Sequence, residues 1–278
     1  DLLMIPSVAI HMNREVNDKA SYNKQVDMLP LLGGAAEEGV LKKLIAAELQ
    51  VAEDQILGSD LFLCIREKAA VWGCNEEFIS SGRLDDQECA FGILKGFLKG
   101  RSERSVNVAA CFDNEEVGSG TKQGAASTFL YDVLRRITLS LGGGEEDFAR
   151  AVASSFLFSA DNAHAVHPNH PELADVTCGA LLGRGVALKR SPRYSSDADT
   201  CAVISGLCDA ANIPLQTYMN RADLPGGSTV GSMASSLLAM PAADIGVPLL
   251  AMHSARELMA AADQDAFVRL CTAFYSAK

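Results

Sequence analysis

The sequence predicts an α/β fold, in which helices cover both faces of a β-sheet. From Ala70 onward, short apolar runs alternate with longer segments of helical period, which is the pattern of such a sheet. The 278 residues, 48% hydrophobic and 21% charged, are enough to bury a core without support from disulfides or a metal. The first sixty or so residues break the alternation, so we expect a second, smaller unit there.

The smaller unit contains short β-like runs that Pro6, Pro30 and the pair Gly33-Gly34 interrupt. An amphipathic segment (Glu37–Gln50) and an apolar run (Asp60–Ile65) follow them. The chain begins on an apolar segment without a helix cap or a polar lead-in. We therefore expect it to begin inside a domain.

The larger unit alternates predicted strands with predicted helices. Short apolar runs predict strands at 105–112, 155–160, 184–189, 213–219 and 245–252. Apolar residues at helical spacing predict helices at 86–99, 123–141, 145–153, 197–211, 228–239 and 254–277, the last broken near residue 263.

The charge of the chain argues against two classes of partner. Lys and Arg total 24 against 35 for Asp and Glu, so the formal net charge of −11 opposes binding to nucleic acid or to an anionic membrane. No run approaches the ~18 consecutive apolar residues that span a bilayer, and the start lacks the basic region and cleavage site of a secretory signal. We expect a soluble protein without a nucleic-acid or membrane partner.

The eight cysteines are scattered and form no CxxC motif. A chain of this length does not need a disulfide framework, so we interpret the cysteines as reduced. A cytoplasmic location fits this interpretation.

The densest group of chemically useful side chains is Asp113-Asn-Glu115-Glu116-Val-Gly-Ser-Gly120, directly after the strand predicted at 105–112. Catalytic groups in open α/β sheets gather at the carboxyl ends of strands. Of two adjacent carboxylates, one can bind a metal while the other serves as general base for a bound water. The simpler alternative is a solvated acidic turn that caps the next helix.

Three more such side chains lie at strand ends or loops. Asp161 and His253 each end an apolar run, and Asp85 lies just before the helix predicted at 86–99. Together with the acidic pair they offer carboxylates and one imidazole on one rim, a donor set that suits zinc or another divalent transition metal. The alternatives are a helix cap for Asp85 and an ordinary strand-end histidine for His253.

Two further groups are weaker. His164, His167 and His170 recur every third residue, but Pro168 interrupts any helix there, so we do not expect a three-histidine site. Lys189 and Tyr194 lie just past a predicted strand, where ordinary surface residues are the alternative.

Six segments of the chain resemble motifs of the M18 metallopeptidases, the aspartyl aminopeptidase family. They run in the family's order and cover nearly the whole chain, at residues 5–14 (IPSVAIHMNR), 77–86 (EFISSGRLDD), 113–119 (DNEEVGS), 159–169 (SADNAHAVHPN), 224–231 (LPGGSTVG) and 250–257 (LAMHSARE). The resemblance implies a three-layer α/β/α, phosphorylase/hydrolase-like catalytic domain at residues 67–278, lacking its N-terminal segment. An inserted, mainly β dimerisation domain, incomplete at its N-terminus, would occupy residues 1–66.

The resemblance also implies two zinc ions. Asp85 would bridge them, Glu116 and His253 would complete one site, and Asp161 would belong to the other. Glu115 would be the general base.

The substrate contacts implied by the resemblance fall on His164, Lys189 and Tyr194. His11 would reach into the active site of the neighbouring subunit, which makes a dimer part of the catalytic machinery. A tetrahedral assembly of twelve subunits is the family's expected final state.

The chain departs from the family's pattern in two places. An additional zinc-binding histidine, expected in an N-terminal stretch of the catalytic domain, has no counterpart here, so one metal site is incomplete. Lys189 and Tyr194 are also two residues closer in sequence than the family pattern.

The function that these residues predict is that of a cytoplasmic di-zinc aminopeptidase that removes N-terminal, acidic residues from peptides. One alternative is a di-metal deacylase of N-acyl amino acids, which comparing rates on the two substrate classes would distinguish. Another is a non-catalytic assembly subunit of the same fold, which a metal count on the purified chain would distinguish.

Overall fold

The computed structural model describes residues 3–34, 38–224 and 226–277. They divide into two compact units, Asp1–Cys64 and Ile65–Lys278. This boundary lies two residues before the sequence-based one. Glu37, the first residue of the predicted amphipathic segment, lies outside the described residues.

The first unit contains one α-helix, α1 (Val40–Leu49), and one 3₁₀ turn, η1 (Glu53–Gln55), within its described residues. The predicted amphipathic segment therefore forms a helix. The β-like runs form no strand in the described part of this unit, which holds a single antiparallel bridge between Met4 and Leu31. An isolated pairing without a third strand or a covering helix is marginal. The mainly β character expected of residues 1–66 is thus absent from the described residues.

The second unit contains six α-helices among its described residues. They are α2 (Leu84–Lys99), α3 (Phe129–Ser140), α4 (Glu145–Ala153), α5 (Ala198–Ala211), α6 (Val230–Leu238) and α7 (Ala261–Tyr275). Two 3₁₀ turns accompany them, η2 (Glu115–Val117) and η3 (Pro171–Leu173). In the described part of the chain, no helix has the length and apolar character needed to cross a bilayer.

Two sheets organise this unit, with strand orders β3-β7-β5-β6 and β1-β2-β9-β8-β4. The strands of the first are β3 (Leu157–Ala160), β7 (Ala242–Gly246), β5 (Val186–Lys189) and β6 (Leu215–Tyr218). Those of the second are β1 (Ala70–Trp72), β2 (Phe78–Ser81), β9 (Glu257–Ala260), β8 (Pro248–Leu250) and β4 (Ala163–His164).

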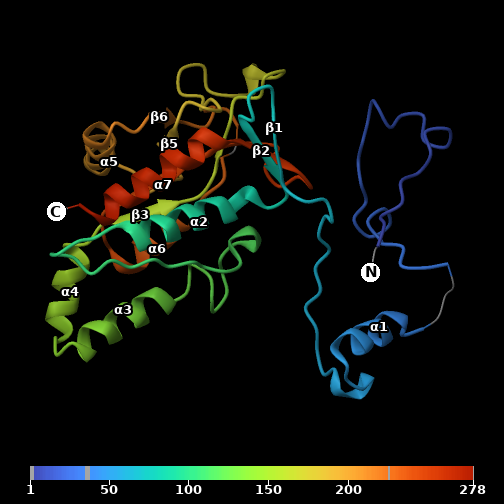
Figure 1. The fold of residues 1–278 in the computed structure, drawn as a ribbon, viewed down its shortest axis with the longest axis horizontal. Helices are drawn as coiled ribbons and strands as arrows, with labels where there is room; N and C mark the ends of the chain where they lie inside the picture. Colours follow the sequence, from blue (N-terminus) through green and yellow to red (C-terminus); the bar gives the residue numbers. More distant parts are fainter. Residues whose placement is uncertain (1–2, 35–37, 225, 278) are drawn as a thin grey trace. The chain divides into compact units, whose positions relative to one another are not determined.

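Helices cover both faces of the first sheet, as the sequence predicts. One core contains Val186, Leu188 and Ile245 of the sheet together with apolar side chains of α2, α5 and α7. The alternate positions Lys189 and Asp244 are absent from this core because successive side chains of a strand point to opposite faces. On the other side, α6 packs against β3 and β7, and α3 packs against α4 and α6. Figure 1 shows α2 and α7 lying side by side.

The chain passes from the first sheet to the second at two neighbouring places. β3 leads into β4 and β7 leads into β8, and both pairs run parallel, β3 with β7 and β4 with β8. Asp161 lies in the first passage, and its N–H donates to the Ile245 carbonyl at 3.0 Å. A Cβ on Gly246 would lie 2.1 Å from the Asp161 carbonyl oxygen, so this close approach requires glycine.

Most predicted elements of the larger unit are confirmed, with three corrections. The segment 105–112 forms no strand, because its apolar residues pair with no other strand and Val106 stays 72% exposed. The run 245–252 is divided between β7 and β8 at Val247. The helix expected from residue 254 starts only at Ala261, because the preceding four residues form β9 and pair with β2.

Candidate metal centre

One pocket of about 280 Å³ in the second unit brings together eight of the nine predicted site residues. They are Asp85, Glu115, Glu116, Asp161, His164, Lys189, Tyr194 and His253. The ninth, His11, is an exposed residue of the first unit. Apart from His11, then, residues spread over most of the larger unit's sequence converge on one cavity.

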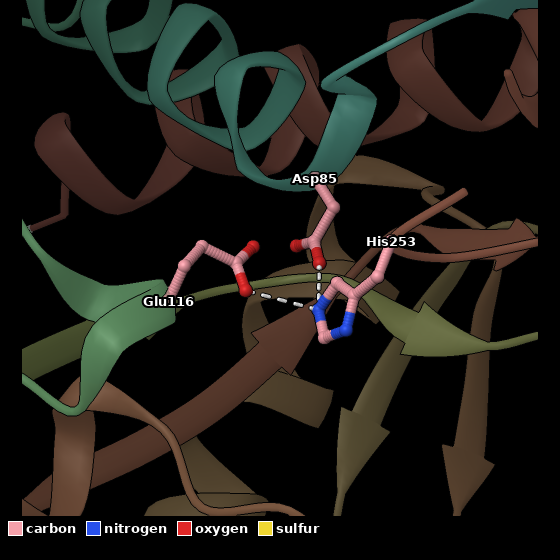
Figure 2. A group of neighbouring side chains, drawn as sticks. All are labelled: Asp85, Glu116 and His253. Atoms are coloured by element: carbon pink, nitrogen blue, oxygen red, sulfur yellow. Dashed lines mark ion pairs between the residues drawn. The ribbon is translucent and has the colours of Figure 1, made fainter. Parts of the chain in front are cut away.

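Asp85, Glu116 and His253 form one group in this pocket that could hold a metal ion (Figure 2). Asp85 comes from the start of α2, Glu116 from η2, and His253 from the turn between β8 and β9. The Nε2 atom of His253 lies 3.0 Å from Asp85 Oδ2 and 3.1 Å from Glu116 Oε2. One imidazole nitrogen thus faces two carboxylates, which is the donor set of a zinc site.

The simpler interpretations were a helix cap for Asp85 and a helix-capping acidic turn for Glu115 and Glu116. Neither accounts for these contacts. Arg83 is the N-cap residue of α2, no side chain caps that helix, and the Asp85 side chain is only 4% exposed. Glu116 likewise faces His253 instead of capping a helix.

A second group consists of Asp85, Asp86 and Asp161, whose carboxylate oxygens lie within 4.8 Å of one another. Asp85 belongs to both groups. Within the described residues, no histidine joins this second group.

Burial and mutual repulsion disfavour the charged form of these carboxylates. Burial, followed by the charges of Asp161 and Glu116, raises the pKa of Asp85 to about 8. Burial raises the pKa of Asp86 well above its ordinary value, and it also raises the pKa of Glu115, with further contributions from Asp161 and Glu116. A bound cation would remove this electrostatic cost.

Two buried oxygens support a cation at this position. Asp85 Oδ1 and Asp86 Oδ1 have no hydrogen-bond partner, although unpaired buried polar atoms are rare in folded proteins. Oxygen atoms of this kind, beside an imidazole nitrogen, suit zinc. The residues present therefore fit the metal that the sequence predicts.

Lys189 and Tyr194 form another wall of the pocket. Lys189 is 1% exposed, so it is not the surface lysine of the simpler interpretation. Its Nζ lies 3.1 Å from Asp161 Oδ2 and 5.3 Å from the centre of the Tyr194 ring. Burial favours the neutral amine, but the Asp161 carboxylate and the Tyr194 phenol hold the pKa of Lys189 above its usual range.

His164 lies in the same pocket at the end of β4. Desolvation, followed by the charge of Lys189, lowers the pKa of His164 below its ordinary value. A neutral imidazole there can accept a hydrogen bond from a ligand or donate one to it.

The loops that supply the candidate ligands contain backbone conformations that side chains rarely adopt. Arg83, Asn114 and His253 have φ values of 60°, 61° and 64°. Such left-handed residues cost about 1–3 kcal/mol each and cluster at functional sites.

Sequence reasoning missed four acids beside the pocket, of which Glu88, Glu257 and Asp244 are buried. Asp86 completes the second carboxylate group, and Glu88 accepts a hydrogen bond from the pocket residue Asn162. Glu257 contacts the backbone of two pocket residues, and Asp244 contacts two of the pocket's loops. Local composition gives a signal only for Asp244, an isolated charge within an apolar run, since Glu257 directly follows Arg256.

Comparison with known proteins identifies the family. A family model described as aminopeptidase I zinc metalloprotease (M18) matches residues 1–275. The probable M18 family aminopeptidase 2 of Clostridium novyi (strain NT) is 46% identical over 99% of this chain and 65% of its own length. That of Clostridium acetobutylicum is 45% identical over the same shares, so this chain spans about two thirds of these curated relatives.

The fold agrees with this assignment. The cryo-EM structure of the Ape4 and Nbr1 complex superposes with a TM-score of 0.90 at 33% identity, covering 99% of this chain and 57% of that chain. The match of the family model over nearly the whole chain and the likeness of the fold lead to one conclusion. This chain belongs to the M18 metallopeptidase family.

Proposed function

We propose that this chain forms the metal centre and substrate pocket of a di-zinc aminopeptidase that removes an N-terminal Asp or Glu from peptides. The observation that supports this most strongly is the contact of His253 Nε2 with the carboxylates of Asp85 and Glu116, at 3.0 and 3.1 Å. Membership of a zinc metalloprotease family supports the same proposal.

The two groups of acidic residues suggest how two ions would be held. Asp85, Glu116 and His253 would bind one, and Asp85 and Asp161 would take part in binding the other. When bound, zinc polarises a scissile carbonyl and lowers the pKa of its water toward ~7. Asp85 is the bridging residue in this proposal because it belongs to both groups.

Glu115 is the proposed general base. It lines the pocket beside Glu116, and a carboxylate there would accept a proton from the attacking water and return it to the leaving amine. The cycle needs no covalent intermediate on the enzyme.

The substitution Glu115→Gln tests this role, since the amide keeps the shape of the side chain but cannot accept the proton. We expect kcat to fall by roughly 10²–10⁴-fold with the zinc content unchanged. His253→Ala is the matched control, because it should lower the zinc content itself. Full activity of Glu115→Gln would refute the assignment, and loss of zinc would make Glu115 a ligand instead.

The proposed acidic preference rests on Lys189, a buried cation in the pocket wall. An acidic substrate side chain brought into a partly dry pocket needs a counter-charge, whereas a neutral one does not. Lys189→Met should therefore lower kcat/KM for N-terminal Asp or Glu much more than for Ala or Leu. Equal slowing of all substrates would mean that Lys189 serves only to hold Asp161, its partner at 3.1 Å.

Self-association is part of the proposal, as a dimer and then as a tetrahedral dodecamer. The first unit exposes large apolar side chains, including Leu57 at 95% and Phe62 at 89%, which favours an interface on it. If His11 acts across that interface, mixing His11→Ala and Glu115→Gln subunits should restore activity that neither has alone. No recovery in verified mixed dimers would refute a role of His11 in the neighbouring subunit.

A cytoplasmic location is also proposed, because all eight cysteines are free thiols and four of them are buried. Reduced thiols are typical of that compartment.

A further inference from the structure

Glu257, the first residue of β9, connects two of the proposed metal ligands through their backbones. Its side chain is buried, and the residue is only 2% exposed. The Oε2 atom accepts a hydrogen bond from the N–H of Asp85 at 3.0 Å, and Oε1 accepts one from the N–H of His253 at 2.7 Å. One carboxylate therefore contacts two ligand residues that lie far apart in the sequence.

The carboxylate itself is held rigidly. Glu257 pairs with Ser81 of β2 in the antiparallel register of β2 and β9, and β9 pairs on its other edge with β8. Pairing of Glu257 with β2, and of the next two residues with β8, fixes the backbone from which the side chain extends. Asp85 and His253, by contrast, belong to a helix start and a turn.

The bond to His253 also stabilises an unfavourable backbone. His253 has a left-handed φ of 64°, which a residue with a side chain adopts only where the surroundings hold it. Its N–H donates to Glu257 in this conformation. This contact therefore helps to hold the turn that presents the imidazole to Asp85 and Glu116.

We infer that Glu257 is a positioning residue of the metal centre, which fixes the spacing between Asp85 and His253 through their main-chain N–H groups. This inference rests on the proposed zinc site and deepens it. Glutamine at this position retains one acceptor oxygen but turns an NH₂ group toward the other N–H, so one of the two ligands loses its anchor.

Asp263 provides a matched control. It is fully buried, and its two carboxylate oxygens accept hydrogen bonds from the N–H groups of Gly183 and Gly185, each at 2.7 Å. Asp263→Asn removes the same kind of contact from the same unit, but from a place that holds no proposed ligand.

The test measures the zinc dissociation constant of the full chain by competition with a chelating dye. We expect Glu257→Gln to weaken zinc binding by roughly 10- to 100-fold, the usual effect of residues that orient metal ligands. It should also change the visible absorption of the Co²⁺-substituted protein. Asp263→Asn should leave both readouts close to those of the unsubstituted chain.

Glu257→Asp serves as a second variant, and also covers the case in which the glutamine variant does not fold. It keeps the charge but shortens the side chain by one methylene, so it should weaken zinc binding as well. Zinc binding by Glu257→Asp as tight as in the unsubstituted chain would overturn the inference, because charge and not position would then matter.

Two other outcomes are distinguishable. If the unsubstituted chain binds zinc and Glu257→Gln weakens binding no more than Asp263→Asn does, the positioning role is refuted while the proposed zinc site stands. If the unsubstituted chain binds no zinc, the proposed function fails and the inference fails with it.

Discussion

Asp244 is predicted to make a large contribution to the stability of the loops around the pocket. It lies in β7 and is 1% exposed. Its Oδ1 accepts hydrogen bonds from the hydroxyls of Ser159 and Thr229 at 2.7 and 2.6 Å. Its Oδ2 accepts two from Ser195, one from the N–H and one from the hydroxyl, both at 2.6 Å. One buried carboxylate thus holds the loop next to Tyr194 and the loop that precedes α6.

The substitution Asp244→Asn keeps one acceptor oxygen and replaces the other by an NH₂ group. The oxygen stays toward the Ser195 N–H, which can only donate, so the NH₂ group replaces Oδ1. The two hydrogen bonds that the Ser159 and Thr229 hydroxyls donate to a charged acceptor are then lost, worth about 1.5–3 kcal/mol each. A buried neutral amide costs less desolvation than a carboxylate, which offsets about 1–2 kcal/mol of the loss. We expect the free energy of unfolding to fall by about 2–4 kcal/mol, and by about 3–5 kcal/mol for Asp244→Ala, which leaves every donor unpaired.

Urea unfolding followed by the fluorescence of Trp72 measures this effect. Trp72 is the only tryptophan of the chain and belongs to β1 of the same unit, so its signal reports that unit. Asp265→Asn, an exposed change on α7, is the control and should stay within about 0.5 kcal/mol. A loss for Asp244→Asn that is no larger than this control would refute the reasoning.

Three more predictions concern the same unit. Gly246→Ala puts a Cβ 2.1 Å from the carbonyl oxygen of Asp161, so it should cost at least about 2 kcal/mol in urea unfolding and weaken zinc binding; a neutral effect would contradict the close approach. Burial raises the pKa of Glu88 to about 8 from an ordinary 4.5, so the unfolded chain releases this proton first and stability falls as pH rises between these values. In chelator-treated protein, Glu88→Gln should reduce that slope by up to about 1.4 kcal/mol per pH unit, and an unchanged slope would show that Glu88 is ionised in the fold. Zinc added at 100 times its dissociation constant should raise the free energy of unfolding of the zinc-free chain by about 2.7 kcal/mol. In a thermal melt, His253→Ala should lose most of this stabilisation.

Strands that coincide with a short apolar run were predictable from the sequence, because such runs are typical of strands in a covered sheet. β3, β5 and β6 lie within the predicted runs, and the residues that follow or end them include Asp161 and Lys189. Catalytic groups gather at such ends, which is why the sequence places these two correctly at the pocket.

Elements that depend on a distant partner were not predictable in the same way. Residues 257–260 have the apolar spacing of a helix, and only their pairing with β2, far away in the sequence, makes them a strand. The run 105–112 has the composition of a strand but has no partner strand, so it stays irregular. A local sequence pattern does not show whether a partner strand exists elsewhere in the chain.

The convergence of the candidate ligands on one pocket was predictable mainly from motifs. Position alone allowed a cap for Asp85 and an ordinary histidine at 253, and it gave no reason to consider Glu257. The contacts that distinguish a candidate ligand from a helix cap or an ordinary histidine join segments far apart in the chain. Two of these contacts are hydrogen bonds from the backbone to Glu257. No spacing rule within one segment describes such contacts.

At the proposed metal centre, the candidate ligands are held in place in two different ways. Asp161 lies where the chain passes between two sheets, so backbone pairing on both sides of the passage fixes it, and Gly246 permits the close contact of the two passages. Asp85 and His253 lie outside the strands and depend on the single carboxylate of Glu257. A substitution at Gly246 should therefore destabilise the fold together with the proposed metal site. A substitution of Glu257 should instead weaken metal binding by more than it destabilises the fold. The ratio of these two losses distinguishes a ligand held by the sheets from a ligand held by one side chain.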